Sequence, residues 1–122
     1  MILWVVGARK FARQLAVLAG RRDSPSRAEF VNMLASDCER DTAIFLWDEL
    51  SVYWKPETPH PDDDFVHDLA IDGDDVTDWV AEFCRQNDLS LNAIRNWPEN
   101  MPSTVRNLAR WLTTERSRLH SA

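Results

Sequence analysis

A chain of 122 residues, 44% of them hydrophobic and 28% charged, is most economically one globular domain spanning 1–122, and it is too short for a two-domain enzyme. The formal net charge of −6 is unevenly spread, because residues 1–22 carry +5 and residues 103–122 carry +3 while the middle of the chain carries −14. An acidic centre disfavours nucleic acid as a partner and favours a basic protein surface.

The N-terminal part, residues 1–50, is expected to be helical. In the segment 8–19 apolar residues recur at helical spacing, and a glycine ends the pattern. The residues concerned are Phe11, Leu15, Leu18 and Gly20. Residues 2–6 fit either the first turn of this helix or a short strand.

Basic residues interrupt the apolar start of the chain at Arg9, Lys10 and Arg13. The start therefore predicts neither a signal peptide nor a membrane span. Without a secretion signal, Cys38 and Cys84 are expected to be buried, reduced thiols, although the sequence leaves their pairing open. We expect a cytoplasmic protein of bacterial type that does not bind a membrane.

A second helix is expected from Ser24-Pro25-Ser26. The proline suits its first turn, and Ser26 with Glu29 has the spacing of a capping box. Its apolar stripe comprises Val31, Leu34, Ala35 and Cys38.

The apolar run 43–54 fits a buried helix or a buried strand about equally. The helix is favoured because Asp48 and Glu49 are poor strand residues. The segment that follows, 55–61, contains three prolines and is expected to be a loop.

The best-specified helix spans 74–86, where apolar residues repeat at i, i+3, i+4, i+7 and i+8. They are Val76, Trp79, Val80, Phe83 and Cys84. Asp72 or Asp74 is expected to cap its first amide groups. A short turn or helix at 89–94 and a closing helix at 103–119 complete an all-α fold, a bundle of four or five helices with one long proline-rich loop.

Eight aspartates lie between positions 62 and 78, and no Lys or Arg separates them. One interpretation is a calcium loop, because hard cations bind several carboxylate oxygens at once. With Gly73 at the sixth position of such a loop, Ala70 would stand third and Trp79 would replace the bidentate acid. The loop pattern fails, and no metal site is predicted.

No nucleophile and base stand at a catalytic spacing, so the sequence predicts no catalytic residue and no enzyme. Cys38 and Cys84 lie on apolar helix stripes, where a structural thiol is usual. The three histidines, His60, His67 and His120, have no partner at ligand spacing. The aromatic residues Trp47, Tyr53 and Trp54 fit either a binding patch or a helical core, and the core is favoured.

A loop containing prolines and acids, 59–64, leads to Phe65, then to Asp68-Leu69 and Asp72, and then to an acidic helix at 74–83. This order resembles an acyl carrier protein, in which such a loop precedes a Phe-x-x-Asp-Leu-Gly-x-Asp-Ser-Leu-type motif and a helix that docks onto basic patches of enzymes. The resemblance covers residues 52–95. The form Ile71-Asp72-Gly73-Asp74-Asp75 is closer still to an uncharacterised bacterial family of acyl-carrier-like proteins.

Gly73 stands where the resemblance places the serine that carries phosphopantetheine. Glycine has no hydroxyl group and cannot form the phosphodiester, and Ser51 and Ser90 lie at the wrong places to substitute. No cofactor is therefore expected. A glycine here also suggests a turn with a positive φ, or a close approach of another backbone segment.

The resemblance and the acidic helix together predict a non-enzymatic, acyl-carrier-like module that binds a basic protein surface. The predicted contact residues are Asp72, Asp74, Asp75, Asp78 and Glu82. The alternative is an acidic inhibitor or immunity-type protein that blocks a nuclease or another nucleic-acid-binding partner. A solvated acidic face without a partner remains the simplest alternative.

Overall fold

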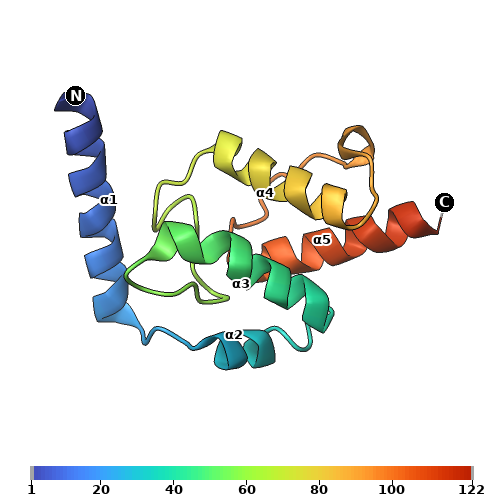
Figure 1. Cartoon of the computed structure of the whole chain (residues 1–122), viewed down its shortest axis with the longest axis horizontal. Coiled ribbons are helices and arrows are strands. Elements are labelled where there is room, and N and C mark those ends of the chain that lie inside the picture. Colours follow the sequence, from blue (N-terminus) through green and yellow to red (C-terminus); the bar gives the residue numbers. More distant parts are fainter. Residues whose placement is uncertain (1, 122) are drawn as a thin grey trace.

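Five α-helices and one short 3-10 helix make up the part of the chain that the computed structural model describes, the backbone of residues 2–121 and the side chains of residues 12–121 (Figure 1). The elements are α1 (Ile2–Arg21), α2 (Arg27–Met33), α3 (Arg40–Trp54), α4 (Gly73–Gln86), η1 (Leu91–Ala93) and α5 (Val105–His120). The all-α fold of four or five helices is confirmed. Within residues 2–121 no helix has both the length and the apolarity that crossing a membrane requires.

Helix α1 is longer than the sequence predicted, because residues 2–6 continue the helix and do not form a strand. Leu15 and Leu18 are buried, as their spacing predicted. Phe11 was predicted to lie on the same stripe, but its side chain is outside the described residues. Figure 1 shows the N-terminal end of α1 pointing away from the other helices, so α1 joins the core through its C-terminal half.

Helix α2 begins with the predicted capping box. The Ser26 side chain accepts a hydrogen bond from the Glu29 amide, and the Glu29 carboxylate accepts one from the Ser26 amide. Because Ser26 occupies the cap position, Pro25 precedes the helix and its predicted place in the first turn is wrong. The helix ends at Met33, so the predicted stripe is cut short and Ala35 is exposed in the turns that follow.

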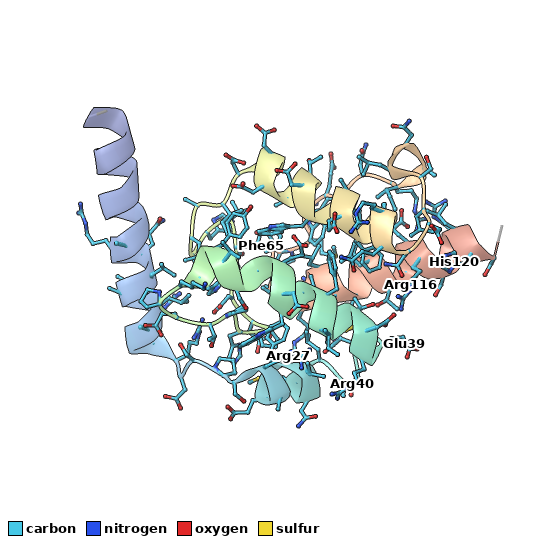
Figure 2. The ribbon with its side chains drawn as sticks, viewed as in Figure 1. Arg27, Glu39, Arg40, Phe65, Arg116 and His120 are labelled. Carbon is cyan, nitrogen blue, oxygen red and sulfur yellow. The ribbon has the colours of Figure 1, made fainter. Side chains whose placement is uncertain are left out.

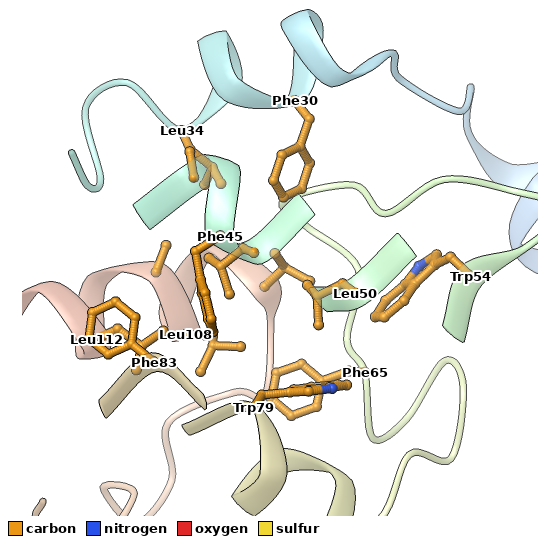
Figure 3. Packing of buried hydrophobic residues seen from close by; sticks show 14 of the residues in the cluster. Phe30, Leu34, Phe45, Leu50, Trp54, Phe65, Trp79, Phe83, Leu108 and Leu112 are labelled. Atoms are coloured by element: carbon orange, nitrogen blue, oxygen red, sulfur yellow. The ribbon is translucent and has the colours of Figure 1, made fainter. Parts of the chain in front are cut away.

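Helix α3 is the centre of the core, and its prediction as a helix is confirmed. It packs against α2 on one side and against α4 and α5 on the other (Figure 1). Figure 3 shows the side chains that meet around it. They include Phe30 and Leu34 from α2 and its end, Phe45, Leu50 and Trp54 from α3, Trp79 and Phe83 from α4, and Leu108 and Leu112 from α5.

The predicted loop at 55–61 is confirmed, and it is part of a longer segment, 55–72, that contains no helix and is anchored to the start of α5. The Phe65 amide donates to the Ser103 carbonyl at 2.9 Å, and the Val105 amide donates to the Asp63 carbonyl at 3.0 Å. Phe65, Leu69 and Ile71 of the loop are buried in the core. This anchoring fixes the point at which α4 begins.

Candidate functional site

Helix α4 begins at Gly73, and the side chain of Asp72 caps it. A carboxylate oxygen of Asp72 accepts a hydrogen bond from the Asp75 amide at 3.0 Å. Of the two caps that the sequence allowed, Asp72 is therefore the one that forms. The predicted apolar stripe is buried at Trp79, Val80, Phe83 and Cys84, and Val76 is half-buried against the core.

Gly73 does not have the backbone geometry that the sequence suggested. No glycine whose backbone is described has a positive φ, and the residue in the left-handed region of this turn is Ala70, with φ 55°. A Cβ atom added at Gly73 would meet nothing within 4 Å. The predictions of a positive φ and of a close backbone approach are wrong, because Gly73 is an ordinary first residue of a helix.

The aspartates at 62–68 are not a free acidic surface. Arginines from both ends of the chain pair with three of them, and the fourth, Asp64, accepts hydrogen bonds from the Ser103 hydroxyl and from the Val66 and His67 amides. Arg22 binds Asp63 at 2.7 Å and Arg21 binds Asp68 at 2.8 Å. Arg106 of α5 binds Asp62 at 3.0 Å, and this contact holds the pKa of Asp62 below its ordinary value. The charge segregation seen in the sequence is thus partly compensated inside the fold.

Further arginines of α5 bind acids near the start of α3. Arg106 and Arg110 both bind the buried carboxylate of Asp37, at 2.5 and 2.6 Å. Arg116 binds Asp41 at 3.0 Å, and Figure 2 shows Arg116 beside the end of α3 where Glu39 and Arg40 are labelled. These pairs fasten α5 across the N-terminal end of α3.

The acids of α4 differ from those of the loop. Asp74 and Asp78 are exposed, and neither has an ion-pair partner among the side chains of residues 12–121. Asp74, Asp78 and Glu82 follow one another at i, i+4 spacing and form one row on the helix surface. Glu82 also binds Arg85 of its own helix, and this contact lowers the pKa of Glu82 to about 2.

Asp75 lies beside this row and faces α3. Its carboxylate accepts a hydrogen bond from the Tyr53 hydroxyl at 3.3 Å. Burial raises the pKa of Asp75, and the neighbouring charge of Asp72 raises it further. Asp75 therefore also contributes to packing between two helices, so it is a poorer probe of binding than Asp74 or Asp78.

Helix α3 adds an acid that the sequence analysis did not include in the site. Burial raises the pKa of Glu49, and the nearby charge of Glu82 raises it further. Helices α3 and α4 lie side by side, and this brings Glu49 near Glu82. The two residues are far apart in the sequence, so no local pattern could have joined them.

A pocket of about 400 Å³ opens on the face of α4 opposite the acidic row of Asp74, Asp78 and Glu82. Its walls come from the loop 55–72, from α4, from the segment 91–97 and from α5. The principal apolar lining residues are Phe65, Val76, Val80, Leu91, Trp97 and Trp111. Gly73 and Thr77 of α4 also line it. The sequence analysis missed this pocket because four separate segments build it.

A buried carboxylate fixes one wall of the pocket. Glu115 of α5 is fully buried and accepts hydrogen bonds from the Arg95 amide at 2.7 Å and from the Arg95 side chain at 2.9 Å. Arg118 binds the same carboxylate, and the two arginines lower the pKa of Glu115 to about 2. The segment 91–97 is thereby held against α5.

The other candidate groups have structural surroundings. Trp54 is fully buried, and Trp47 and Tyr53 pack against Phe30 and Trp79, so the interpretation of these aromatic residues as core is confirmed. Both cysteines are free thiols, and burial raises the pKa of Cys38 to about 11. Among the described residues, no group of three His, Cys, Asp or Glu side chains is placed to hold a metal ion.

Comparison with known proteins adds no relative, since no family model, no curated protein and no solved structure matches this chain.

Proposed function

We propose that this protein is a non-enzymatic, acyl-carrier-like binding module that docks onto a basic surface of a partner protein through the acidic row of α4. The observation that carries the proposal is the contrast between two sets of aspartates. Asp62, Asp63 and Asp68 of the loop are matched by arginines of the same chain, whereas Asp74 and Asp78 are exposed without a cation partner among residues 12–121.

Helix stability alone does not account for these two acids. Asp72 already caps α4, and one or two carboxylates are enough to interact with the dipole of the helix. Each additional carboxylate repels its neighbours, so the row works against folding. A basic partner would relieve that repulsion and would be steered to the site over a distance of about 8 Å at physiological salt.

The resemblance to acyl carrier proteins supports the same surface. The helix that it assigns to partner recognition is α4, and Gly73 is the first residue of that helix. Without a hydroxyl group at this position the proposed module keeps the docking helix and lacks the carrier chemistry. We place its action in the cytoplasm.

The test is affinity capture from a native lysate at low and high salt, followed by association rates with the captured protein. The double variant Asp74→Asn/Asp78→Asn should slow association severalfold and flatten its salt dependence. The control Asp88→Asn/Glu99→Gln removes the same charge from exposed acids outside α4 and should leave the rate nearly unchanged. Equal rates for both double variants would refute the proposal, and capture of a nuclease would favour the inhibitor alternative.

A further inference from the structure

We infer that the pocket beside α4 binds a small aromatic acid, with the ring of the ligand among the aromatic side chains of the pocket and its carboxylate at Arg95. This inference goes beyond the proposed function, because it involves neither the acidic row of α4 nor a protein partner. It starts from the lining of the pocket, in which Arg95 is the one charged residue among the described side chains.

The apolar part of the pocket suits a flat ring. Its volume of about 400 Å³ lies within the range of small-molecule sites, about 300–1,000 Å³. Trp97 packs edge to face against Phe65 with ring centroids 6.3 Å apart, and it packs against Trp111 with centroids 5.2 Å apart. Aromatic rings attract another ring by more than the area that they bury. This wall therefore favours an aromatic ligand over an aliphatic chain.

The charged end of the pocket is positive. The carboxylate of Glu115 binds both Arg95 and Arg118, at 2.8 and 2.9 Å, so the three side chains together carry one net positive charge. Glu115 is fully buried, whereas the side chain of Arg95 is 59% exposed. A ligand in the pocket therefore meets the guanidinium group of Arg95 and not the carboxylate behind it.

The free polar groups at this end are donors. Glu115 holds the guanidinium group of Arg95 through Nε and Nη2, and the third nitrogen, Nη1, has no acceptor among the described atoms. The Nε1 group of Trp111, which also lines the pocket, likewise has no acceptor in the described part of the chain. Guanidinium and indole N–H groups donate and do not accept. A carboxylate is the ligand group that satisfies them, and its bond to Arg95 is assisted by charge.

The acids around the pocket do not reverse its sign. Asp64 accepts a hydrogen bond from the hydroxyl of Ser103 in the pocket wall, and two backbone amides of its own loop donate to it as well. Its charge is therefore met by three donors. Asp74 and Asp78 lie on the opposite face of α4.

A second hollow adjoins the pocket at its positive end. It has a volume of about 390 Å³, shares Arg95 and Trp111 with the pocket, and has no acid among its described lining residues. Its other cation, Arg110, is paired with Asp37. Arg95 is thus the cation that both hollows present to a ligand.

The experiment is calorimetric titration of the full-length protein with three aromatic acids: benzoate, 2-naphthoate and indole-3-acetate. Each acid is compared with its uncharged amide, and octanoate serves as an acid with an aliphatic chain. We expect at least one aromatic acid to bind about tenfold or more tightly than its amide and than octanoate, because the amide loses a charge-assisted hydrogen bond and octanoate loses the ring contacts.

Two pairs of variants locate the ligand. Arg95→Gln should abolish the preference for acid over amide, whereas Arg118→Gln removes the other arginine from Glu115, leaves the pocket lining intact and should keep the preference. Val76→Phe enlarges a side chain of the pocket wall and should weaken acid and amide alike. Its control is Val52→Phe, at a residue of α3 that is 68% exposed, and it should bind as the wild type does. Thermal melting checks that each variant is folded.

Several results would overturn the inference and leave the proposed function standing. They are no binding of any of the three acids at millimolar concentration, amides or octanoate that bind as tightly as the acids, or a preference for the acid that survives Arg95→Gln. Binding that Val76→Phe leaves unchanged would place the ligand elsewhere and would also overturn it. If Arg95→Gln does not fold, the comparison of acid with amide on the wild type and on Val76→Phe still decides. Asp74→Asn/Asp78→Asn should bind the acids as the wild type does, so the two proposals fail or hold separately.

Discussion

Two buried tryptophans differ in what their indole N–H groups meet. The Trp54 Nε1 group donates to Asp63 at 2.8 Å, and the same carboxylate oxygen also accepts from the His60 amide at 2.9 Å. The Trp79 Nε1 group is buried and has no hydrogen-bond partner among the described atoms. One ring therefore carries a polar contact that the other lacks, although both fill the core.

Replacing each tryptophan by phenylalanine measures that contact. Both Trp54→Phe and Trp79→Phe lose a similar ring volume, but only Trp54→Phe leaves a buried carboxylate without one of its donors. We expect Trp54→Phe to lower the free energy of unfolding by about 1–3 kcal/mol more than Trp79→Phe does. Urea denaturation of the two variants checks this, and equal losses would show that the bond to Asp63 contributes nothing.

Gly73 allows a direct test of the resemblance to carrier proteins. Wild-type protein incubated with coenzyme A and a broad-specificity phosphopantetheinyl transferase should gain no mass. Gly73→Ser should fold within about 0.5 kcal/mol of wild type, because the added side chain has open space at the first residue of α4. If the resemblance extends to the docking surface, the transferase should attach phosphopantetheine to Gly73→Ser, and intact-mass measurement should show the added mass. A mass gain by the wild type would point to another serine.

At the scale of elements, α4 separates a packed face from a charged face. Phe83 packs edge to face against Phe45 with ring centroids 5.3 Å apart, and the Arg116 guanidinium lies 5.7 Å from the centre of its ring. Phe83→Ala should therefore cost about 3–5 kcal/mol. Asp78→Ala on the exposed face should change stability by about 0.5 kcal/mol or less. Chemical denaturation compares them, and similar losses would contradict the observed register of α4.

The contact of Glu115 with the segment 91–97 predicts that the stability of the fold depends on pH. The pKa of Glu115 is about 2 in the folded protein, below the ordinary value of 4.5, so ionised Glu115 stabilises the fold above pH 4.5 and this contribution is lost as the pH falls toward 2. At pH 7, Glu115→Gln should have a free energy of unfolding lower than that of the wild type by on the order of 2 kcal/mol, after allowance for screening. On acidification, the free energy of unfolding of the variant should fall less than that of the wild type. Denaturation curves at pH 7, 5 and 3 measure both effects.

The control for this experiment is Glu99→Gln, which changes an exposed acid in the loop before α5 and should follow the wild-type curve. Parallel pH profiles for wild type and Glu115→Gln would show that the buried carboxylate is not the group that titrates.

The sequence was sufficient to predict a helix wherever apolar residues repeat at helical spacing or a capping residue directly precedes the helix. The stripe of α4, the caps at Ser26 and Asp72, and the loop at 55–61 all depend on residues within one or two turns of each other. The helix boundaries were less accurate, since α1 extends to Ile2 and α2 stops at Met33. The pocket was missed because its walls meet only in the folded chain.

At the scale of the whole molecule, the sequence did not show which aspartates of the acidic centre pair with arginines. The eight aspartates look alike in the sequence, but their partners lie 41 residues away for Asp63, 44 for Asp62 and 47 for Asp68. No local pattern indicates which acids will meet an arginine. The tertiary fold makes that distinction, and it leaves the row on α4 as the candidate surface.

The contacts that both ends of the chain make with the loop 55–72 have a consequence for synthesis on the ribosome. Arg21 and Arg22 are translated before the loop, and Arg106 is translated after it, so the loop acquires its last cation only when α5 has emerged. Leu108 and Leu112, which complete the core around α3, arrive at the same time. A nascent chain that ends before α5 lacks the core contacts of Leu108 and Leu112, and its loop lacks the ion pair between Asp62 and Arg106. We therefore expect the domain to complete its folding only after α5 has left the ribosome.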